Sequence, residues 1–212
     1  MFSFVIPTFW ACDISKFDSL VDKLTTCDSV SEILIVNNAP YKYSHRYSYN
    51  SKVKELVFQD IYLYQSWNIG VYQSKNDFIC LMSDMVEFNL DVMKFIHSEM
   101  SRNDFHILGI AKECLSIDED SEYSISKIEM RNKYWATLLF TKKDKYTWIP
   151  DDFRVYFGDD YLIQQSMGHI CKLNGLKVRV TNSLFDGINV DEIINNDTTN
   201  SYKYSLPLSY DY

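Results

Sequence analysis

A short apolar run ends in a serine and an acidic residue, in a position suited to chemistry. The run Phe78–Met82 has five apolar residues between polar neighbours, which is typical of a parallel strand buried on both faces. Ser83 and Asp84 come next. Because ligands of open α/β sheets gather at the carboxyl ends of such strands, Asp84 is predicted to lie at a binding or catalytic edge. The alternative is that Ser83 or Asp84 only caps the helix that follows.

A second acidic feature comes late in the chain, where Asp159 and Asp160 are adjacent and precede a predicted helix. A positioned carboxylate can remove the proton from an attacking hydroxyl, which accelerates a transfer by roughly 10²–10⁴-fold. The dipole at a helix N-terminus also favours acids without any catalysis. On these residues alone, the helix N-terminus is the favoured interpretation and catalysis is the alternative.

Apolar runs that alternate with helical patterns surround these acids. Strands are predicted at 3–6, 32–36, 56–58, 78–82, 105–110, 135–140 and 177–180, and helices at 15–27, after 67–71, at 90–100 and from Asp160 through Leu173. Pro7 is expected to turn the first strand off the sheet. This alternation predicts a single α/β domain, with a mostly parallel central sheet and helices on both faces. The domain is expected to span residues 1–194, and residues 195–212 a polar, Tyr-rich tail.

Composition narrows the class of protein. A chain of 212 residues with 46% hydrophobic residues can bury one sizeable core. No window approaches the roughly 18 apolar residues of a membrane span, and the start lacks a basic leader and a cleavage site, so a cytoplasmic protein is expected. Five widely spaced cysteines, without Cys-x-x-Cys or paired histidines nearby, favour neither disulfides nor a zinc site. The sixteen tyrosines and few alanines are typical of AT-rich coding, as in a virus, a phage or a low-GC bacterium.

Taken together, the polar strand ends resemble those of GT-A (Rossmann-like) glycosyltransferases, specifically glycosyltransferase family 2. The matching segments, in chain order, are Ile6-Pro7-Thr8, Val36-Asn37-Asn38, Asn68-Ile69-Gly70, Leu81-Met82-Ser83-Asp84 and Gly158-Asp159-Asp160. Each segment alone is weak, but five in this order, over residues 3 to about 180, are fairly specific. The resemblance implies an inverting transfer of a sugar from a nucleotide-sugar, with a UDP-sugar favoured, to an acceptor hydroxyl.

The resemblance also implies a donor site made of Pro7, Thr8, Asn37, Asn38, Asn68, Gly70, Ser83 and Asp84. The family usually has Asp at position 37, and Asn37 keeps the acceptor oxygen but loses the charge. The alternative for Asn37-Asn38 is a plain turn.

Asp84 matches the last acid of the family's Asp-x-Asp motif, a ligand for Mn²⁺ or Mg²⁺. Met82 stands where the first acid would be, and hard cations want oxygen ligands. Asp186 is expected to supply a further oxygen, although a loop Asp is more often only solvated.

For catalysis, the resemblance implies that Asp160 is the base and that Asp159 orients the acceptor or the sugar. Tyr134, Trp135 and Trp148 are expected to stack on the acceptor, although Trp135 begins a predicted strand and suits the core equally well. His169 is given no role.

The acceptor is the least determined feature. A phage origin suggests a 5-hydroxymethylated pyrimidine in DNA, held by the basic segment 127–145, whereas the net charge of −8 argues against nucleic acid. Saccharide or protein acceptors are the alternatives, as is a GT-A protein that binds a nucleotide-sugar without turnover. A dinucleotide-binding enzyme is excluded because no Gly-x-Gly-x-x-Gly follows a strand.

Overall fold

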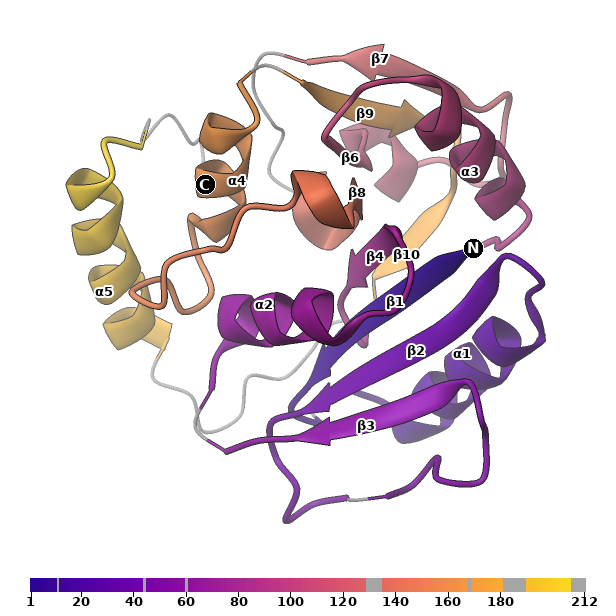
Figure 1. The fold of residues 1–212 in the computed structure, drawn as a ribbon, viewed down its shortest axis with the longest axis horizontal. Coiled ribbons are helices and arrows are strands. Elements are labelled where there is room, and N and C mark those ends of the chain that lie inside the picture. The colour runs from indigo at the N-terminus through magenta and orange to yellow at the C-terminus, as the bar shows by residue number, and fades with distance from the viewer. Residues whose placement is uncertain are drawn as a thin grey trace.

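An eight-stranded sheet runs through the molecule, in the order β3-β2-β1-β4-β8-β6-β9-β7 (Figure 1). The structure, a computed structural model, describes residues 1–10, 12–43, 45–59, 61–128, 135–167, 169–180 and 190–206. The strands of this sheet are β1 Phe2–Thr8, β2 Val30–Asn37, β3 Val53–Val57, β4 Phe78–Met82, β6 Ile107–Ile110, β7 Ser124–Lys127, β8 Leu138–Lys142 and β9 Ile170–Asn174. Strands β1 to β4 are parallel, β8 is antiparallel to both its neighbours, and β6 and β9 are parallel to each other. A separate antiparallel pair joins β5 (Val86–Phe88) to β10 (Val178–Val180).

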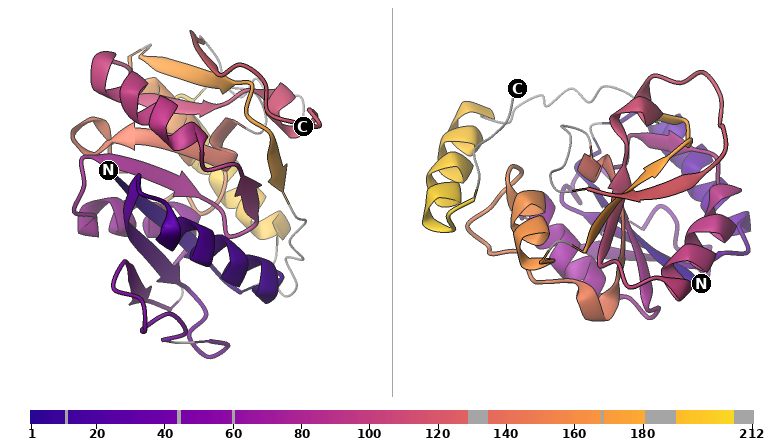
Figure 2. Two further views of the ribbon diagram at one scale, coloured as in Figure 1. Left: turned by 90° about the vertical axis from the view of Figure 1, so that its right-hand side faces the viewer. Right: turned by 90° about the horizontal axis from the view of Figure 1, so that it is seen from above.

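Helices cover both faces of the sheet (Figure 2). Helices α1 (Ile14–Thr26) and α3 (Val92–Arg102) lie on one face, and α2 (Leu63–Gln73) and α4 (Gly158–Gln165) on the other. A last helix, α5 (Val190–Lys203), lies beyond α4, and short 3₁₀ turns occur at Lys112–Leu115, Trp135–Thr137 and Lys143–Lys145. The predicted α/β class, with one mostly parallel sheet between helices, is confirmed.

The central strands are apolar throughout because each of them is buried on both faces. In β1, Phe4 and Ile6 pack into the α1/α3 layer, whereas Val5 packs into the α2/α4 layer. Helix α2 approaches β1 so closely that a Cβ on Gly70 would lie 2.1 Å from Cγ1 of Val5. Gly70 is therefore required by the packing of this helix on the sheet.

Strand β1 continues through Pro7, whereas the sequence predicted a turn there. Pro7 pairs with Val36 of β2, but the pairing of β1 with β4 ends at Val5. Because Pro7 has a strand neighbour on one side only, its missing N–H costs no ladder hydrogen bond.

The helix predicted through Leu173 is wrong beyond Gln165, where α4 ends. Residues Ile170–Asn174 instead form β9, which lies between β6 and β7. A short apolar run has no periodicity that separates a strand from a helix, and its position beside β6 decides the outcome here. Gly175 directly follows this strand and has a φ of +82°.

The boundary predicted after residue 194 falls inside α5, and residues 195–203 are helical. Their polar side chains are partly internal, since Asp197 and Ser201 are buried. These residues therefore belong to the same unit as the sheet and are no detached tail. Among the residues that the structure describes, no helix is long and apolar enough to cross a membrane.

Asp152 anchors α5 and gives this contact a pH dependence. Hydrogen bonds from the Lys203 ammonium and from the Tyr204 hydroxyl, the latter at 2.8 Å, hold the pKa of the Asp152 carboxyl below its ordinary value. A carboxyl with a lowered pKa in the folded state stabilises above its unfolded pKa of about 3.9 and loses that contribution as the pH falls through its folded pKa.

We therefore expect Asp152→Asn to lower the melting temperature slightly at pH 7. The effect should correspond to less than about 1 kcal/mol, because both charged groups are largely exposed and solvent screens the pair. Thermal unfolding between pH 3 and pH 7 checks this, with the exposed neighbour Asp151→Asn as the control. A deficit that stays constant down to pH 3 would contradict the assignment.

Candidate active site

Polar residues at the carboxyl ends of β1, β2 and β4 are in direct contact. The Thr8 hydroxyl at the end of β1 donates to Oδ2 of Asp84, just beyond β4, at 2.6 Å. The backbone N–H of Asn38, just beyond β2, donates to the Thr8 carbonyl at 2.9 Å. Three predicted site residues from distant parts of the sequence are thus joined at one edge of the sheet.

Asp84 lies in an environment that disfavours an isolated negative charge. Burial raises the pKa of its carboxyl, although hydrogen bonds from Thr8, Cys12 and Ser83 oppose that shift. Burial and the Asp84 carboxylate raise the pKa of the Cys12 thiol to about 12, so Cys12 stays protonated and can donate. A bound cation would offset the cost of ionising Asp84.

The residues present fit a hard cation only in part. Asp84 and Ser83 offer oxygen atoms, which Mn²⁺ and Mg²⁺ prefer. Met82 is fully buried among the apolar residues of the α1/α3 layer, where a carboxylate would be costly. A cation at Asp84 therefore needs further oxygens, such as those of a diphosphate and water. Asp186 lies outside the described residues.

Asn37 has a structural role, because its amide is saturated. Its Oδ1 accepts from the Trp10 indole at 2.8 Å and from the N–H of Ala39 at 3.0 Å. Its Nδ2 donates to the Tyr43 carbonyl and to Oε1 of Glu55, both at 2.6 Å. Asp at this position would place a second carboxylate against Glu55, which accounts for an amide here.

Asn38, in contrast, keeps an unused acceptor. The Ser66 hydroxyl donates to the Tyr62 carbonyl at 2.8 Å, so it must accept from Asn38 Nδ2, which lies 2.9 Å away. This fixes the orientation of the amide, and Asn38 Oδ1 is buried with no hydrogen-bond partner in the part of the chain that the structure describes. A buried acceptor of this kind is where an N–H of a ligand would be stabilised.

Helix α2 connects this edge to the acid pair. Two residues before Ser66, the Tyr64 hydroxyl donates to Oδ1 of Asp159 at 3.1 Å. Asp159 and Asp160 are both buried in the first turn of α4, and Phe157, the residue before this helix, has a φ of +63°. The sequence singled out Asp84 and the acid pair but missed Cys12, Tyr64 and Ser66, which belong to no motif and are recognised only by their contacts.

Asn68 and Gly70 are not at this edge. Asn68 holds the segment before α4, because Nδ2 donates to the Ile149 carbonyl at 2.7 Å and Oδ1 accepts from the Ile149 N–H at 3.0 Å and from the Tyr146 hydroxyl at 2.9 Å. Gly70 contacts Val5, as described above. The third motif therefore packs α2, and its expected role in donor binding has no support in this geometry.

Trp135 cannot line an acceptor site, which corrects that expectation. Its side chain is fully buried, its indole donates to the Cys171 carbonyl at 2.9 Å, and its ring fills the space beside Gly109. Trp148 is exposed over 53% of its surface and stays a candidate for acceptor binding. Tyr134 lies outside the described residues.

Two lysines of the basic segment, Lys142 and Lys143, lie at the opposite end of β4 from Asp84. Lys142 pairs with Phe78 at the start of β4, which is the opposite end of the strand from Asp84. The ammonium of Lys142 donates to the Asn103 carbonyl at 3.0 Å, and that of Lys143 to the Ser74 carbonyl at 2.6 Å. These two side chains hold loops at the amino edge of β4, and neither forms a hydrogen bond with the candidate active site in the part of the chain that the structure describes.

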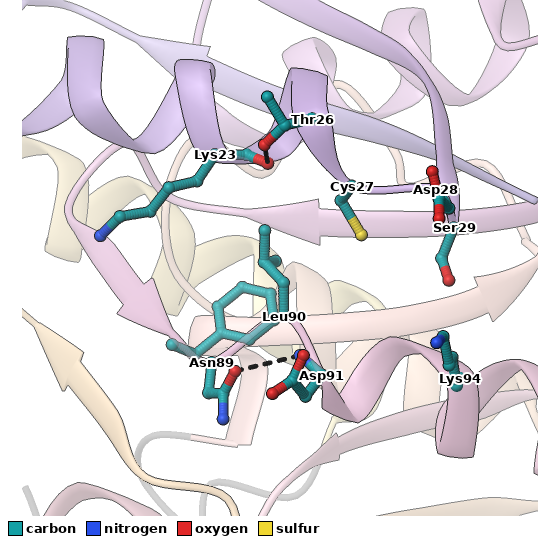
Figure 3. Close-up of a pocket in the computed structure, with 10 residues that line it drawn as sticks. Lys23, Thr26, Cys27, Asp28, Ser29, Asn89, Leu90, Asp91 and Lys94 are labelled. Carbon is teal, nitrogen blue, oxygen red and sulfur yellow. Dashed lines mark hydrogen bonds between the residues drawn. The ribbon is translucent and has the colours of Figure 1, made fainter.

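A surface hollow of about 450 Å³ lies elsewhere, between the end of α1 and the turn that leads into α3 (Figure 3). Its lining comprises Lys23, Thr26, Cys27, Asp28, Ser29, Phe88, Asn89, Leu90, Asp91 and Lys94. None of the predicted donor-binding or catalytic residues contributes to it. The hollow is therefore distinct from the candidate active site.

Comparison with known proteins adds structural neighbours. No family model and no curated protein matches the sequence. Among solved structures, S. aureus TarS 1-349 in complex with UDP-GlcNAc is similar over 100% of this chain and 67% of its own, with a TM-score of 0.65 and 12% identity. GalNAc-T7 with UDP, GalNAc and Mn²⁺ is similar over 89% of this chain and 44% of its own, with a TM-score of 0.63 and 13% identity. This chain thus spans less than half of GalNAc-T7. The fold of this chain is the GT-A glycosyltransferase fold.

Proposed function

We propose that this protein is a glycosyltransferase of the family 2 type that transfers a sugar from a UDP-sugar to an acceptor hydroxyl. The observation that carries the proposal is one series of contacts across the carboxyl edge of the sheet. It runs from Asp84 through Thr8 to Asn38 and Ser66, and α2 then connects it through Tyr64 to Asp159. The neighbours support a nucleotide-sugar as donor, since one was solved with UDP-GlcNAc and the other with UDP, GalNAc and Mn²⁺.

Asn38 is proposed to read the base of the donor. Uracil carries a proton on N3, and Asn38 Oδ1 is an acceptor that lacks a partner among the described residues. Cytosine carries no proton on N3, so this contact favours UDP over CDP. Because Oδ1 is buried, a neighbouring side chain has to move for the base to reach it.

Asp84 and Ser83 are proposed to hold Mn²⁺ or Mg²⁺ beside the donor diphosphate. The cation, when bound, neutralises charge that develops on the leaving diphosphate. Thr8 and Cys12 contribute by fixing the Asp84 carboxylate through hydrogen bonds.

Asp160 is proposed to act as the base of a single displacement. The acceptor oxygen forms a bond to the anomeric carbon, the bond from that carbon to the diphosphate oxygen breaks, and the acceptor proton passes to Asp160. Attack opposite the leaving group inverts the configuration. Asp159, which accepts from the Tyr64 hydroxyl, is proposed to orient the acceptor or the sugar.

Duplex DNA as acceptor loses part of its support. The expected phosphate contacts of Lys142 and Lys143 are not available at the candidate active site, because these side chains serve the opposite edge. These lysines therefore give no reason to favour a hydroxymethylated base over a saccharide or peptide hydroxyl as the acceptor, and all three acceptor classes have to be tested.

The test is a screen of UDP-sugars with Mn²⁺ against these three acceptor classes, in which UDP release and product mass are measured. We expect transfer from at least one donor by the wild-type chain and loss of it in Asp84→Asn. Asp77→Asn, an exposed change at the other end of β4, is the matched control and should stay active. UDP binding without UDP release from any donor would instead show a GT-A protein that binds nucleotide-sugars without turnover.

A further inference from the structure

Three potential metal ligands meet at the edge of the sheet opposite to Asp84. The ligand atoms of Asp104, His106 and His169 all lie within 4.8 Å of one another. Asp104 and His106 precede β6, and His169 precedes β9, which is the parallel neighbour of β6. Since β6 runs in the same direction as β4, this cluster lies at the amino edge of the sheet and shares no residue with the candidate active site.

The backbone holds the two histidines side by side. The N–H of His106 donates to the His169 carbonyl at 2.8 Å, and the Thr141 hydroxyl donates to the His106 carbonyl at 2.9 Å. Their rings are stacked with centroids 4.6 Å apart and an interplanar angle of 13°. Both imidazoles therefore come together through strand pairing alone.

A contact of His169 favours the tautomer that can bind a metal. Nδ1 of His169 lies 3.1 Å from the carbonyl oxygen of Asp104. A proton on Nδ1 makes this contact a hydrogen bond and leaves the lone pair of Nε2 available. Histidines that bind metals commonly donate their other ring N–H to a backbone carbonyl in this way.

The charges around the cluster are mixed. Burial, His169 and Lys145 lower the pKa of the His106 imidazole, whereas Asp104 and Asp144 oppose the shift. The Lys145 ammonium lies 3.9 Å from Oδ1 of Asp104 and competes with a cation for that oxygen. Because the Lys145 side chain is partly exposed, it can turn into solvent when a cation binds. Its pairing with Asp104 therefore lowers the affinity for the cation but does not prevent binding.

We propose that Asp104, His106 and His169 bind one Zn²⁺ ion or a similar borderline divalent cation. Two imidazole nitrogens and one carboxylate oxygen match the donors that Zn²⁺ takes at about 2.0–2.2 Å, and water completes a tetrahedron. Mn²⁺ and Mg²⁺ prefer oxygen ligands and are not expected here. The sequence favoured no zinc site because it contains no closely spaced ligand motif, whereas β6 and β9 join ligands that are far apart in the chain.

A cation at this position would tie the connection after α4 to the turn before β6. Helix α4 carries the acid pair at its other end. A ligand that binds only the folded state raises stability in proportion to the logarithm of its concentration over its dissociation constant. The site is thus expected to stabilise the position of α4 from the side away from the proposed catalytic edge.

The experiment uses the full chain without a histidine tag, stripped of metal, in the Asp84→Asn background so that the other edge binds no cation. Calorimetry with Zn²⁺ and thermal unfolding are measured for this protein and with His106→Asn, His169→Asn or Asp104→Asn added. His45→Asn, an exposed histidine outside the cluster, is the matched control. The visible absorption spectrum of a Co²⁺-substituted sample shows whether the ion is bound by nitrogen and oxygen ligands or by cysteine thiolates.

We expect one Zn²⁺ per chain, at least tenfold weaker binding in each cluster variant, no loss in the control, and a melting temperature that Zn²⁺ raises only when the cluster is intact. The Asp104 side chain is 74% exposed, so Asp104→Asn tests the site without risk to folding. Equal Zn²⁺ affinity in Asp104→Asn, His169→Asn and the background protein would overturn the proposal, as would a Co²⁺ spectrum dominated by thiolate ligands.

Discussion

Replacing Asp160 with asparagine should reduce sugar transfer by roughly 10²–10⁴-fold while UDP affinity stays nearly unchanged. A base acts on the acceptor proton in the transition state, so its removal affects turnover and not the ground-state binding of the donor. Steady-state rates and calorimetric titration with UDP, on the same preparations, separate the two quantities. Circular dichroism verifies that the buried position tolerates the amide.

Matched variants decide which member of the pair is the base. Asp159→Asn should retain more transfer activity than Asp160→Asn. Tyr64→Phe should lose activity for the same reason as Asp159→Asn, but to a smaller extent, because Tyr64 donates to Asp159. Asp151→Asn, an exposed acid on the loop before α4, should behave as wild type. If Asp159→Asn were inactive and Asp160→Asn active, the assignment of base and orienting residue would have to be exchanged.

Asp197→Ala should be the most destabilising single change in α5. Its fully buried carboxylate accepts three backbone N–H groups, from Arg154 at 3.0 Å, Val155 at 2.8 Å and Tyr156 at 2.7 Å. Hydrogen bonds to a charged group contribute about 1.5–3 kcal/mol each, and buried donors without a partner add a further cost. We expect the free energy of unfolding to fall by at least about 3 kcal/mol.

The same variant should also reduce sugar transfer, because residues 154–156 lead directly into α4 and its acid pair. Urea denaturation gives the stability, and amide hydrogen exchange at residues 154–156 reports the freed loop. Asn195→Ala, exposed on the same helix, is the control. Asp197→Asn keeps one carbonyl oxygen, so its free energy of unfolding should lie between those of Asp197→Ala and Asn195→Ala. A loss of less than 1 kcal/mol in Asp197→Ala would show that α5 does not hold this loop.

The sequence predicted the strands of the parallel half of the sheet and the polar residues at the ends of β1, β2 and β4. Strands buried on both faces are short apolar runs, and the polar residue that follows each run marks its carboxyl end. Asp84 was predicted in this way, whereas Thr8 and Asn38 were predicted as site residues from the resemblance to glycosyltransferase family 2. The structure joins the three by hydrogen bonds. Only the prediction of Asp84 depended on local pattern and on the geometry of parallel sheets alone.

The remaining features depended on contacts between distant segments. Asn37 and Asn38 look equivalent in sequence, but Glu55 and Trp10 saturate the first and leave the second available. Trp135 was an acceptor candidate until its burial against β9 excluded it. Helix α5 has too many polar residues for a periodic pattern, and the buried Asp197 that anchors it is recognisable only from the loop amides that it binds.

Binding of UDP to the wild-type chain and to Asp84→Asn, with and without Mn²⁺, tests the central claim most directly. The claim is that Asp84 and its neighbours at the carboxyl edge of β1, β2 and β4 form a cation-assisted site for a nucleoside diphosphate. Calorimetry should show UDP affinity at least tenfold higher with Mn²⁺ in the wild type, and little or no effect of Mn²⁺ in Asp84→Asn. CDP should bind more weakly than UDP because Asn38 Oδ1 can accept from uracil N3–H, whereas N3 of cytosine is itself an acceptor. Equal UDP affinity in the two proteins, unchanged by Mn²⁺, would contradict the account.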